Sequence, residues 1–164
     1  MLDLACGDGG FADPLLARGL AYTGVDANEH MVRAARRRLG DRARVEHGDL
    51  NDYRPAVPVA VTCVFRAIYY ARDRRDFFRS AASYTTEKLV FDLNPRQYAL
   101  AEVRRDLEAV GFDGLDIRPF FTPQTRAVRQ PLRSALAWLE HSGPIAKLLL
   151  RRRFTYLCAA YRRA

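Results

Sequence analysis

Three acidic residues in the first third of the chain are placed where their carboxylates could bind one ligand. Asp3 lies within a short apolar run, and Asp26 and Asp49 each follow another short strand-like segment. A carboxylate such as that of Asp26 can accept hydrogen bonds from both hydroxyls of a ribose, and Asp49 can accept one from the amine of an adenine. Gly7 and Gly9 lie between the first two acids, where glycine lets the backbone approach a ligand closely. These residues predict a site for a nucleotide-like cofactor.

The elements that must position these residues alternate between strand and helix. Short apolar segments predict strands, and apolar residues at helical spacing predict helices. We expect strands at residues 1–5, 22–26, 44–47, 59–65, 88–93, 115–121 and 154–161, and helices at 11–18, 28–39, 75–84, 97–110, 135–140 and from the Ser-Gly-Pro break to residue 150. The strand at 59–65 is nearly all apolar, so we expect it to be covered on both faces. The alternation predicts a three-layer α/β fold, with a mostly parallel seven-stranded sheet, as a single domain of residues 1–164.

The carboxyl ends of parallel strands are where such a sheet binds its ligands. The first three expected strands would therefore bring Asp3, Asp26 and Asp49 to one edge of the sheet. The apolar side chains of Leu50 and Met31 could then lie on either side of the ligand's ring.

Two cofactors fit this arrangement of glycines and acids. The spacing of Gly7, Gly9 and Ala12, with Asp26 further on, formally matches the dinucleotide fingerprint of NAD-binding proteins, including NAD-dependent oxidoreductases. Asp3 argues against NAD as the cofactor, because a buried carboxylate costs several kcal/mol of stability unless it is paired. A ligand that carries a positive charge would account for an acid at this position.

The run LDLACGDGG at residues 2–10 resembles motif I of class I S-adenosylmethionine-dependent methyltransferases, an acid followed by three alternating glycines. Ala5 stands in place of the first glycine, and Gly7 and Gly9 match the other two. Segment 24–31 is similar to the second motif of this family.

Two later segments extend the same resemblance. Residues 48–50 are similar to the third motif and residues 59–70 to the fourth. The ordered set covers nearly the whole chain, and it implies a Rossmann-like sheet whose seventh strand is antiparallel. It also implies a helical excursion, residues 121–153, that forms part of a lid over the methyl acceptor.

The resemblance implies S-adenosylmethionine as the cofactor and gives each residue a role. Asp3 would lie near the ammonium of the methionine part, Asp26 would hold the ribose, and Asp49 would bind the adenine. The residues implied in cofactor binding are Asp3, Ala5, Cys6, Gly7, Gly9, Asp26, Ala27, Met31, Gly48, Asp49, Leu50, Phe65 and Arg66. The expected reaction is methyl transfer to a small-molecule acceptor, with RNA the less favoured acceptor.

The acceptor side of the site is less defined in the sequence. Tyr69 and Tyr70 follow the fourth expected strand and could shape the acceptor pocket or act as a base, while no catalytic base is identified. Members of this family usually carry one or two helices before motif I, whereas Met1 here already lies in the first expected strand. The alternatives are a shortened start, a second chain over the site, or a non-catalytic relative that serves in binding or interaction.

Composition narrows the class of protein further. The 164 residues are 49% hydrophobic and 28% charged, which is typical of a globular domain. The sequence offers no membrane-spanning run and no signal segment, so we expect a cytoplasmic protein. Cys6, Cys63 and Cys158 lie in apolar stretches and are expected to be buried thiols, with no metal site. Self-association into a homo-oligomer stays open.

The net charge of +8 raises the question of nucleic-acid binding. Nearly all of the positive charge is arginine, since Lys88 and Lys147 are the only lysines. A bias toward GC-rich codons produces the same skew, so nucleic-acid binding is considered but not favoured.

Overall fold

Seven strands form one sheet in the order β3-β2-β1-β4-β5-β7-β6. The computed structural model describes residues 1–120, 129–143, 145 and 155–162. The strands are β1 (Leu2–Leu4), β2 (Thr23–Asp26), β3 (Arg44–His47), β4 (Val59–Val64), β5 (Thr85–Leu93), β6 (Gly114–Phe120) and β7 (Thr155–Tyr161). The first five run parallel, and β7 lies antiparallel between β5 and β6. The predicted mostly parallel sheet with an antiparallel last strand is thus confirmed.

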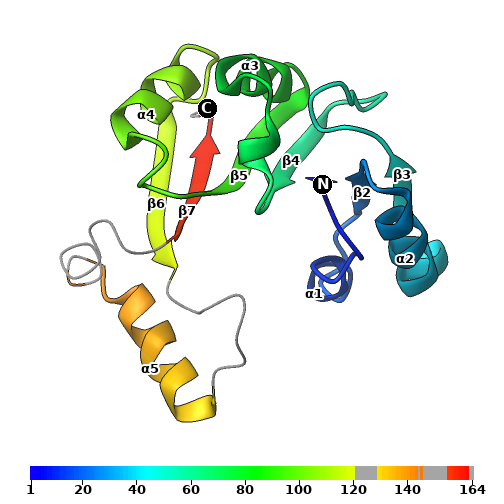
Figure 1. Ribbon diagram of the computed structural model, residues 1–164, viewed down its shortest axis with the longest axis horizontal. Helices are drawn as coiled ribbons and strands as arrows, with labels where there is room; N and C mark the ends of the chain where they lie inside the picture. The colour runs from blue at the N-terminus through cyan, green and yellow to red at the C-terminus, as the bar shows by residue number, and fades with distance from the viewer. Residues whose placement is uncertain (121–128, 144, 146–154, 163–164) are drawn as a thin grey trace.

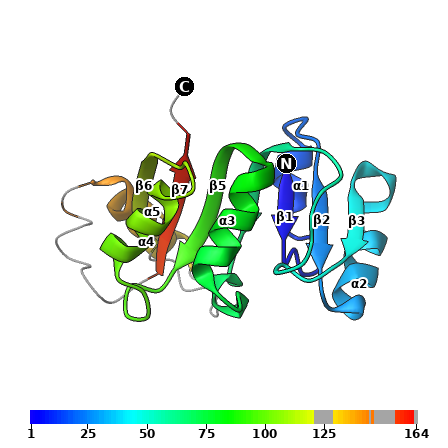
Figure 2. The same cartoon turned by 90° about the horizontal axis from the view of Figure 1, so that it is seen from above.

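Helices cover both faces of this sheet. They are α1 (Ala12–Leu16), α2 (Glu29–Leu39), α3 (Arg74–Tyr84), α4 (Leu100–Glu108) and α5 (Gln130–His141), with short 3₁₀ turns η1 (Gly40–Arg42) and η2 (Ile68–Tyr70). Figure 1 shows α3 and α4 on one side of the sheet and α1, α2 and α5 on the other. In Figure 2, α3 and α4 lie nearest the viewer, over the half of the sheet that contains β5, β7 and β6. No helix in the described ranges is long and apolar enough to cross a membrane.

Helix α2 illustrates how closely local sequence sets an element. Asn28 is its N-cap, and the Asn28 side chain accepts a hydrogen bond from the His30 amide at 2.9 Å. Val32, Ala35 and Leu39 form the buried stripe of the helix. The same three side chains pack with Val45 of β3 in a smaller core cluster on this side of the sheet.

Four expectations about these elements need correction. Strand β5 begins at Thr85 and not at Lys88, directly after the last residue of α3. Strand β4 is buried only in its second half. In its first half Val59 and Val61 are half-buried and Ala60 is exposed. Helix α4 begins at Leu100 and not at Gln97, since the amides of Gln97 and Tyr98 bond to the Asn94 carbonyl in a turn. Helix α5 is longer than expected and starts at residue 130. The second helix expected to end at residue 150 lies outside the described residues, apart from residue 145.

A buried carboxylate joins the two helices on the other side of the sheet. Asp106 of α4 lies 2.5 Å from a guanidinium nitrogen of Arg74 and 3.0 Å from one of Arg75, both in α3. The Arg74 guanidinium also lies over the Tyr98 ring, 5.5 Å from its centroid. Asp106 and Arg74 are largely shielded from water, so this ion pair fixes α4 against α3.

Asp106→Ala is expected to lower the free energy of unfolding by about 3 kcal/mol, because Arg74 is then left shielded from water without its partner. Glu102→Ala is the matched control. The Glu102 carboxylate also reaches Arg74, at 3.7 Å, but it is exposed, so the loss is expected to stay below about 1 kcal/mol. Urea denaturation of the two variants measures the difference, and equal losses would contradict this account of the ion pair.

Candidate functional site

The loop between β1 and α1 adopts a conformation that depends on glycine. Gly7 has φ +58° and Gly9 has φ +76°, in the left-handed region. A Cβ on Gly9 would lie 2.9 Å from the Leu39 side chain, so this glycine also allows the loop to pack against α2. The amides of Gly9 and Ala12 donate to the carbonyls of Cys6 and Gly9, which turns the chain into α1.

Ala5 shares the left-handed conformation although it is not a glycine. Its φ is +61°, and it occupies the position where motif I usually has a glycine. A Cβ in this region costs about 1–2 kcal/mol. The loop therefore holds strain at the end of β1, as functional loops often do.

Asp26, the last residue of β2, holds this loop in place. One carboxylate oxygen accepts the Gly7 amide at 2.9 Å, and the other accepts the Asn28 amide at 2.8 Å. A carboxylate has about four acceptor positions, so both oxygens keep capacity for a further donor. Asp26 thus connects the glycine loop to the start of α2 and faces the same space as the loop.

Asp3 is a buried acid in the middle of β1, with 3% of its surface exposed. The Tyr22 hydroxyl donates a hydrogen bond to its carboxylate at 2.6 Å. Burial raises the pKa of Asp3 to about 6; the Tyr22 bond opposes this shift, and the nearby charge of Asp26 adds to it. At neutral pH the carboxylate is therefore mostly ionised, although burial disfavours its charge.

These residues line one cavity of about 610 Å³ at the carboxyl ends of β1, β2 and β4. Ten predicted residues line it: Asp3, Ala5, Cys6, Gly7, Asp26, Met31, Phe65, Arg66, Tyr69 and Tyr70. Four further lining residues were not predicted, namely Asp8, Gly10, Phe11 and Ala67. Asp8, Gly10 and Phe11 lie inside or directly after the glycine loop. Extending the predicted site along the whole loop would therefore have included them.

Five predicted residues lie around this cavity without lining it. Gly9 packs on α2, and the Ala27 carbonyl lies 2.9 Å from the His47 ring nitrogen. The Gly48 amide donates to the Asp26 carbonyl at 3.0 Å, which keeps β3 beside β2. Leu50 packs into the main core, with 8% of its surface exposed.

Asp49, the fifth of these residues, belongs to a network that sequence reasoning missed. Its carboxylate accepts the backbone amide and the side chain of Asn51, and these bonds lower the pKa of Asp49. The Asn51 side chain also donates to the Tyr70 carbonyl at 3.3 Å and accepts the Arg72 amide at 2.9 Å. Asn51 thus fixes the segment that presents the two tyrosines to the cavity.

The wall of the cavity carries exposed apolar and aromatic surface. Met31 is 40% exposed, Tyr69 50% and Tyr70 67%, and the two tyrosine rings pack with centroids 4.7 Å apart. Rings exposed at the mouth of a cavity offer a surface on which a flat ligand can stack.

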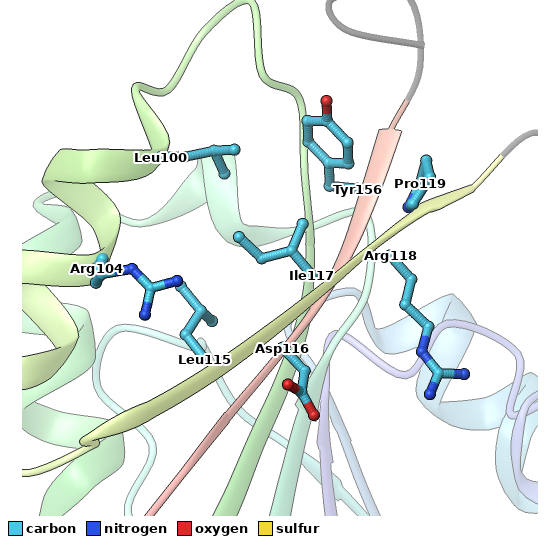
Figure 3. Close-up of a pocket in the computed structure, with 8 residues that line it drawn as sticks. All are labelled: Leu100, Arg104, Leu115, Asp116, Ile117, Arg118, Pro119 and Tyr156. Atoms are coloured by element: carbon cyan, nitrogen blue, oxygen red, sulfur yellow. The ribbon is translucent and has the colours of Figure 1, made fainter. Parts of the chain in front are cut away.

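A separate cavity of about 480 Å³ lies at the β6 edge of the sheet. Figure 3 shows Leu115 and Ile117 pointing toward α4 there, with Asp116 and Arg118 pointing to the other side. None of its lining residues lines the cavity at the glycine loop. The described residues also contain no group of three or more His, Cys, Asp or Glu that could hold a metal ion.

The chain is similar to known proteins in both sequence and structure. Residues 1–88 match the family model described as "Methyltransferase domain". Over 61 residues the chain is 43% identical to trans-aconitate 2-methyltransferase of Rhizobium meliloti (strain 1021). That match covers 36% of this chain and 23% of the relative, so the matched segment spans under a quarter of the relative's length.

Solved structures with much lower identity share the fold. An S-adenosylmethionine-dependent methyltransferase from Mesorhizobium loti aligns with a TM-score of 0.71 and 18% identity, over 98% of this chain and 90% of that one. Magnesium protoporphyrin IX methyltransferase from Synechocystis PCC 6803, with bound S-adenosylmethionine, aligns with a TM-score of 0.68 and 17% identity, over 99% and 69%. Because the family model spans more than half of the chain, the chain belongs to the methyltransferase-domain family, and its fold is the Rossmann-like fold of class I methyltransferases.

Ala5→Gly is expected to raise the free energy of unfolding by up to about 1 kcal/mol. Glycine relieves the left-handed strain, and its larger freedom in the unfolded chain offsets part of that gain. Ala34→Gly, in the middle of α2, is the control and should lose about 0.5–1 kcal/mol. Thermal unfolding measures both changes, and a loss at position 5 as large as that at position 34 would rule out a strained loop.

Asp3→Asn is expected to be more stable than the parent protein at neutral pH. The folded-state pKa of about 6 exceeds the ordinary 3.8, so the folded protein loses stability as the pH rises from about 4 to 6. Asparagine can still accept the Tyr22 hydroxyl and has no charge, so its advantage should grow to roughly 3 kcal/mol by pH 7. Urea midpoints at pH 4 and pH 7 test this; a constant difference between the proteins would contradict it.

Proposed function

We propose that the chain binds S-adenosylmethionine in the cavity at the glycine loop and transfers its methyl group to a small-molecule acceptor. The observation that carries this proposal is the buried acid Asp3. Its carboxylate lines the cavity, and no cationic side chain in the described residues forms an ion pair with it. A cofactor with an ammonium group supplies the positive charge that this acid lacks, directly or through water.

The other residues of the cavity fit the rest of the same cofactor. Asp26 keeps acceptor capacity for the ribose hydroxyls, and the backbone at Gly7 leaves room for close approach. The exposed side chains of Met31 and Tyr70 offer apolar surface for the adenine ring. Roles for the non-lining residues, including adenine contacts by Asp49 and Leu50, stay predictions.

Bound S-adenosylmethionine would supply an electrophilic methyl group on a positively charged sulfur. The chain's own contribution to such a reaction is alignment, because an in-line displacement needs the acceptor, the methyl group and the sulfur on one line. Phe65 and Arg66 follow β4 beside the cavity and are placed to flank the methionine part.

A small-molecule acceptor is supported by the names of the relatives and by the use of arginine. Two of the three named proteins carry a small-molecule substrate in their names, trans-aconitate and magnesium protoporphyrin IX. Several arginines lie against acids: Arg33 on Glu29, Arg38 on Asp8 and Asp13, Arg42 on Asp13, and Arg72 on Asp52. Ion pairs of this kind leave less charge for RNA phosphates, so RNA stays the less favoured acceptor.

The same proposal extends to the organisation of the chain. We treat residues 1–164 as one methyltransferase-like domain. A lid role for residues 121–153 stays a prediction, because within this range the structure describes only residues 129–143 and 145. A cytoplasmic location and a homo-oligomer remain predictions.

Calorimetry with S-adenosylhomocysteine tests the cofactor directly. S-adenosylhomocysteine keeps the ammonium, ribose and adenine, so we expect binding, and no binding of NAD. Asp3→Asn should weaken it by about 10- to 150-fold, since a bond to a charged group contributes about 1.5–3 kcal/mol.

Asp13→Asn is the matched control for that measurement. Asp13 lies in α1 outside the cavity, and its carboxylate is paired with Arg38 and Arg42 at the surface, so its loss should change the affinity less than threefold. Failure of the parent protein to bind S-adenosylhomocysteine would overturn the proposed function. An equal effect of both variants would remove Asp3 from its proposed role.

A further inference from the structure

A second cavity lies directly beside the one at the glycine loop. It has a volume of about 330 Å³ and is lined by Phe11, Phe65, Arg66, Asp92, Phe120, Thr155 and Leu157. Four of these seven side chains are wholly apolar, and the only acid among them is Asp92. Cavities of this size and character accommodate small ligands.

The two cavities share a wall. Phe11, Phe65 and Arg66 line both of them, and the two phenylalanine rings meet edge to face with centroids 4.9 Å apart. The two cavities are therefore adjacent, with these three residues in the wall between them.

Asp92 is held in this wall by the backbone. It lies in β5, opposite Leu157 of β7, and its Oδ1 accepts a hydrogen bond from the Arg66 amide. Arg66 reaches this position with φ +56°, a left-handed conformation that a non-glycine residue rarely adopts. The chain is thus locally strained where the segment after β4 meets the Asp92 carboxylate.

The surroundings of Asp92 suit a proton acceptor. Burial raises the pKa of Asp92 above its ordinary value of 3.8, and the Arg66 amide and charge oppose this shift. The other titratable groups that interact with it are Tyr69 and the buried thiol of Cys158. Burial raises the pKa of both, and Tyr69 lines only the first cavity, so neither competes as a base at neutral pH.

We propose that the second cavity receives the methyl acceptor, that this acceptor is a small apolar ring compound bearing a hydroxyl or an amine, and that Asp92 binds and deprotonates that group. This inference rests on the proposed function. The apolar lining selects the ring, and the carboxylate selects a group that can donate a hydrogen bond. An acceptor that directs a carboxylate at Asp92 is disfavoured, because two like charges would then meet.

The methyl transfer needs only the acceptor, the cofactor, the Asp92 carboxylate and water. The acceptor's oxygen or nitrogen lone pair forms the new bond to the methyl carbon while the carbon–sulfur bond breaks and its electrons stay on sulfur. The proton of the acceptor's O–H or N–H passes to the Asp92 carboxylate and from there to water. Asp92 acts as a catalytic base, and such proton transfer contributes about 10²- to 10⁴-fold to a rate.

Four probes test the class of acceptor: 2-naphthol, 2-naphthylamine, 2-naphthoate and trans-aconitate. Saturation-transfer NMR on the protein loaded with S-adenosylhomocysteine measures binding, and transfer of a labelled methyl group measures turnover. We expect 2-naphthol and 2-naphthylamine to bind and react, and the two carboxylates to do neither. If S-adenosylhomocysteine binds but 2-naphthol and 2-naphthylamine do not, or if 2-naphthoate binds as well as they do, the inference is overturned.

Asp92→Asn tests the role of the carboxylate. Asparagine can still accept the Arg66 amide, so affinity for S-adenosylhomocysteine should change less than twofold, while turnover of 2-naphthol falls at least about 100-fold. In the parent protein kcat/KM should rise with pH as Asp92 ionises, and the variant should lose this dependence. Asp116→Asn, an exposed acid of β6 outside this cavity, is the control and should leave both unchanged.

Phe120→Ala provides a second variant should Asp92→Asn unfold. Phe120 lines only the second cavity, so KM for 2-naphthol should rise about 10-fold with kcat and cofactor affinity retained. Unchanged turnover and pH dependence in Asp92→Asn would overturn the inference. Failure of S-adenosylhomocysteine to bind the parent protein would overturn the proposed function instead.

Discussion

The carboxylate of Asp26 is the interaction on which the first cavity depends. It accepts the amide of Gly7 from the loop after β1 and the amide of Asn28 from the start of α2. Two connections that are distant in sequence are thereby held at one edge of the sheet. Since Gly9 lets the same loop pack on α2, the loop is constrained from both sides. The Asp26 carboxylate therefore fixes the backbone that forms one side of the cavity.

Charge is distributed unevenly between the two adjacent cavities. In the first, the buried acid Asp3 stands beside a glycine loop whose backbone amides are already engaged. In the second, Asp92 is the single acid, in a lining of four apolar side chains together with Arg66 and Thr155. In both cavities, burial raises the pKa of the carboxyl. Asp3 therefore favours a ligand with a positive charge, and Asp92 favours a group that donates a proton. Arg66, whose backbone is in the left-handed region, lines both cavities.

Much of this architecture follows from local patterns that the sequence displays. Strand β3 and helix α2 have the expected bounds, because alternation, capping by Asn28 and the apolar stripe are all local signals. The edges of α4 and the half-exposed β4 could not be predicted in the same way, since they depend on a turn at Asn94 and on what covers the sheet.

The candidate site likewise contains residues that local sequence patterns predict and residues that only long-range contacts reveal. The glycine loop and Asp26 carry motif spacing, whereas Asn51 and Asp92 have no motif. Asn51 matters through bonds to Asp49, Tyr70 and Arg72, and Asp92 through its contact with Arg66, 26 positions earlier. Contacts of this range become visible only when the strands are in register.

The shared wall of the two cavities has a consequence for how such a protein can diverge. Phe11 and Phe65 touch both cavities, so a change at either alters the two sites together. Phe120, Thr155 and Leu157 face the second cavity alone, from the antiparallel pair β6 and β7. New acceptor preferences can therefore arise by substitution in this strand pair while the glycine loop is inherited intact.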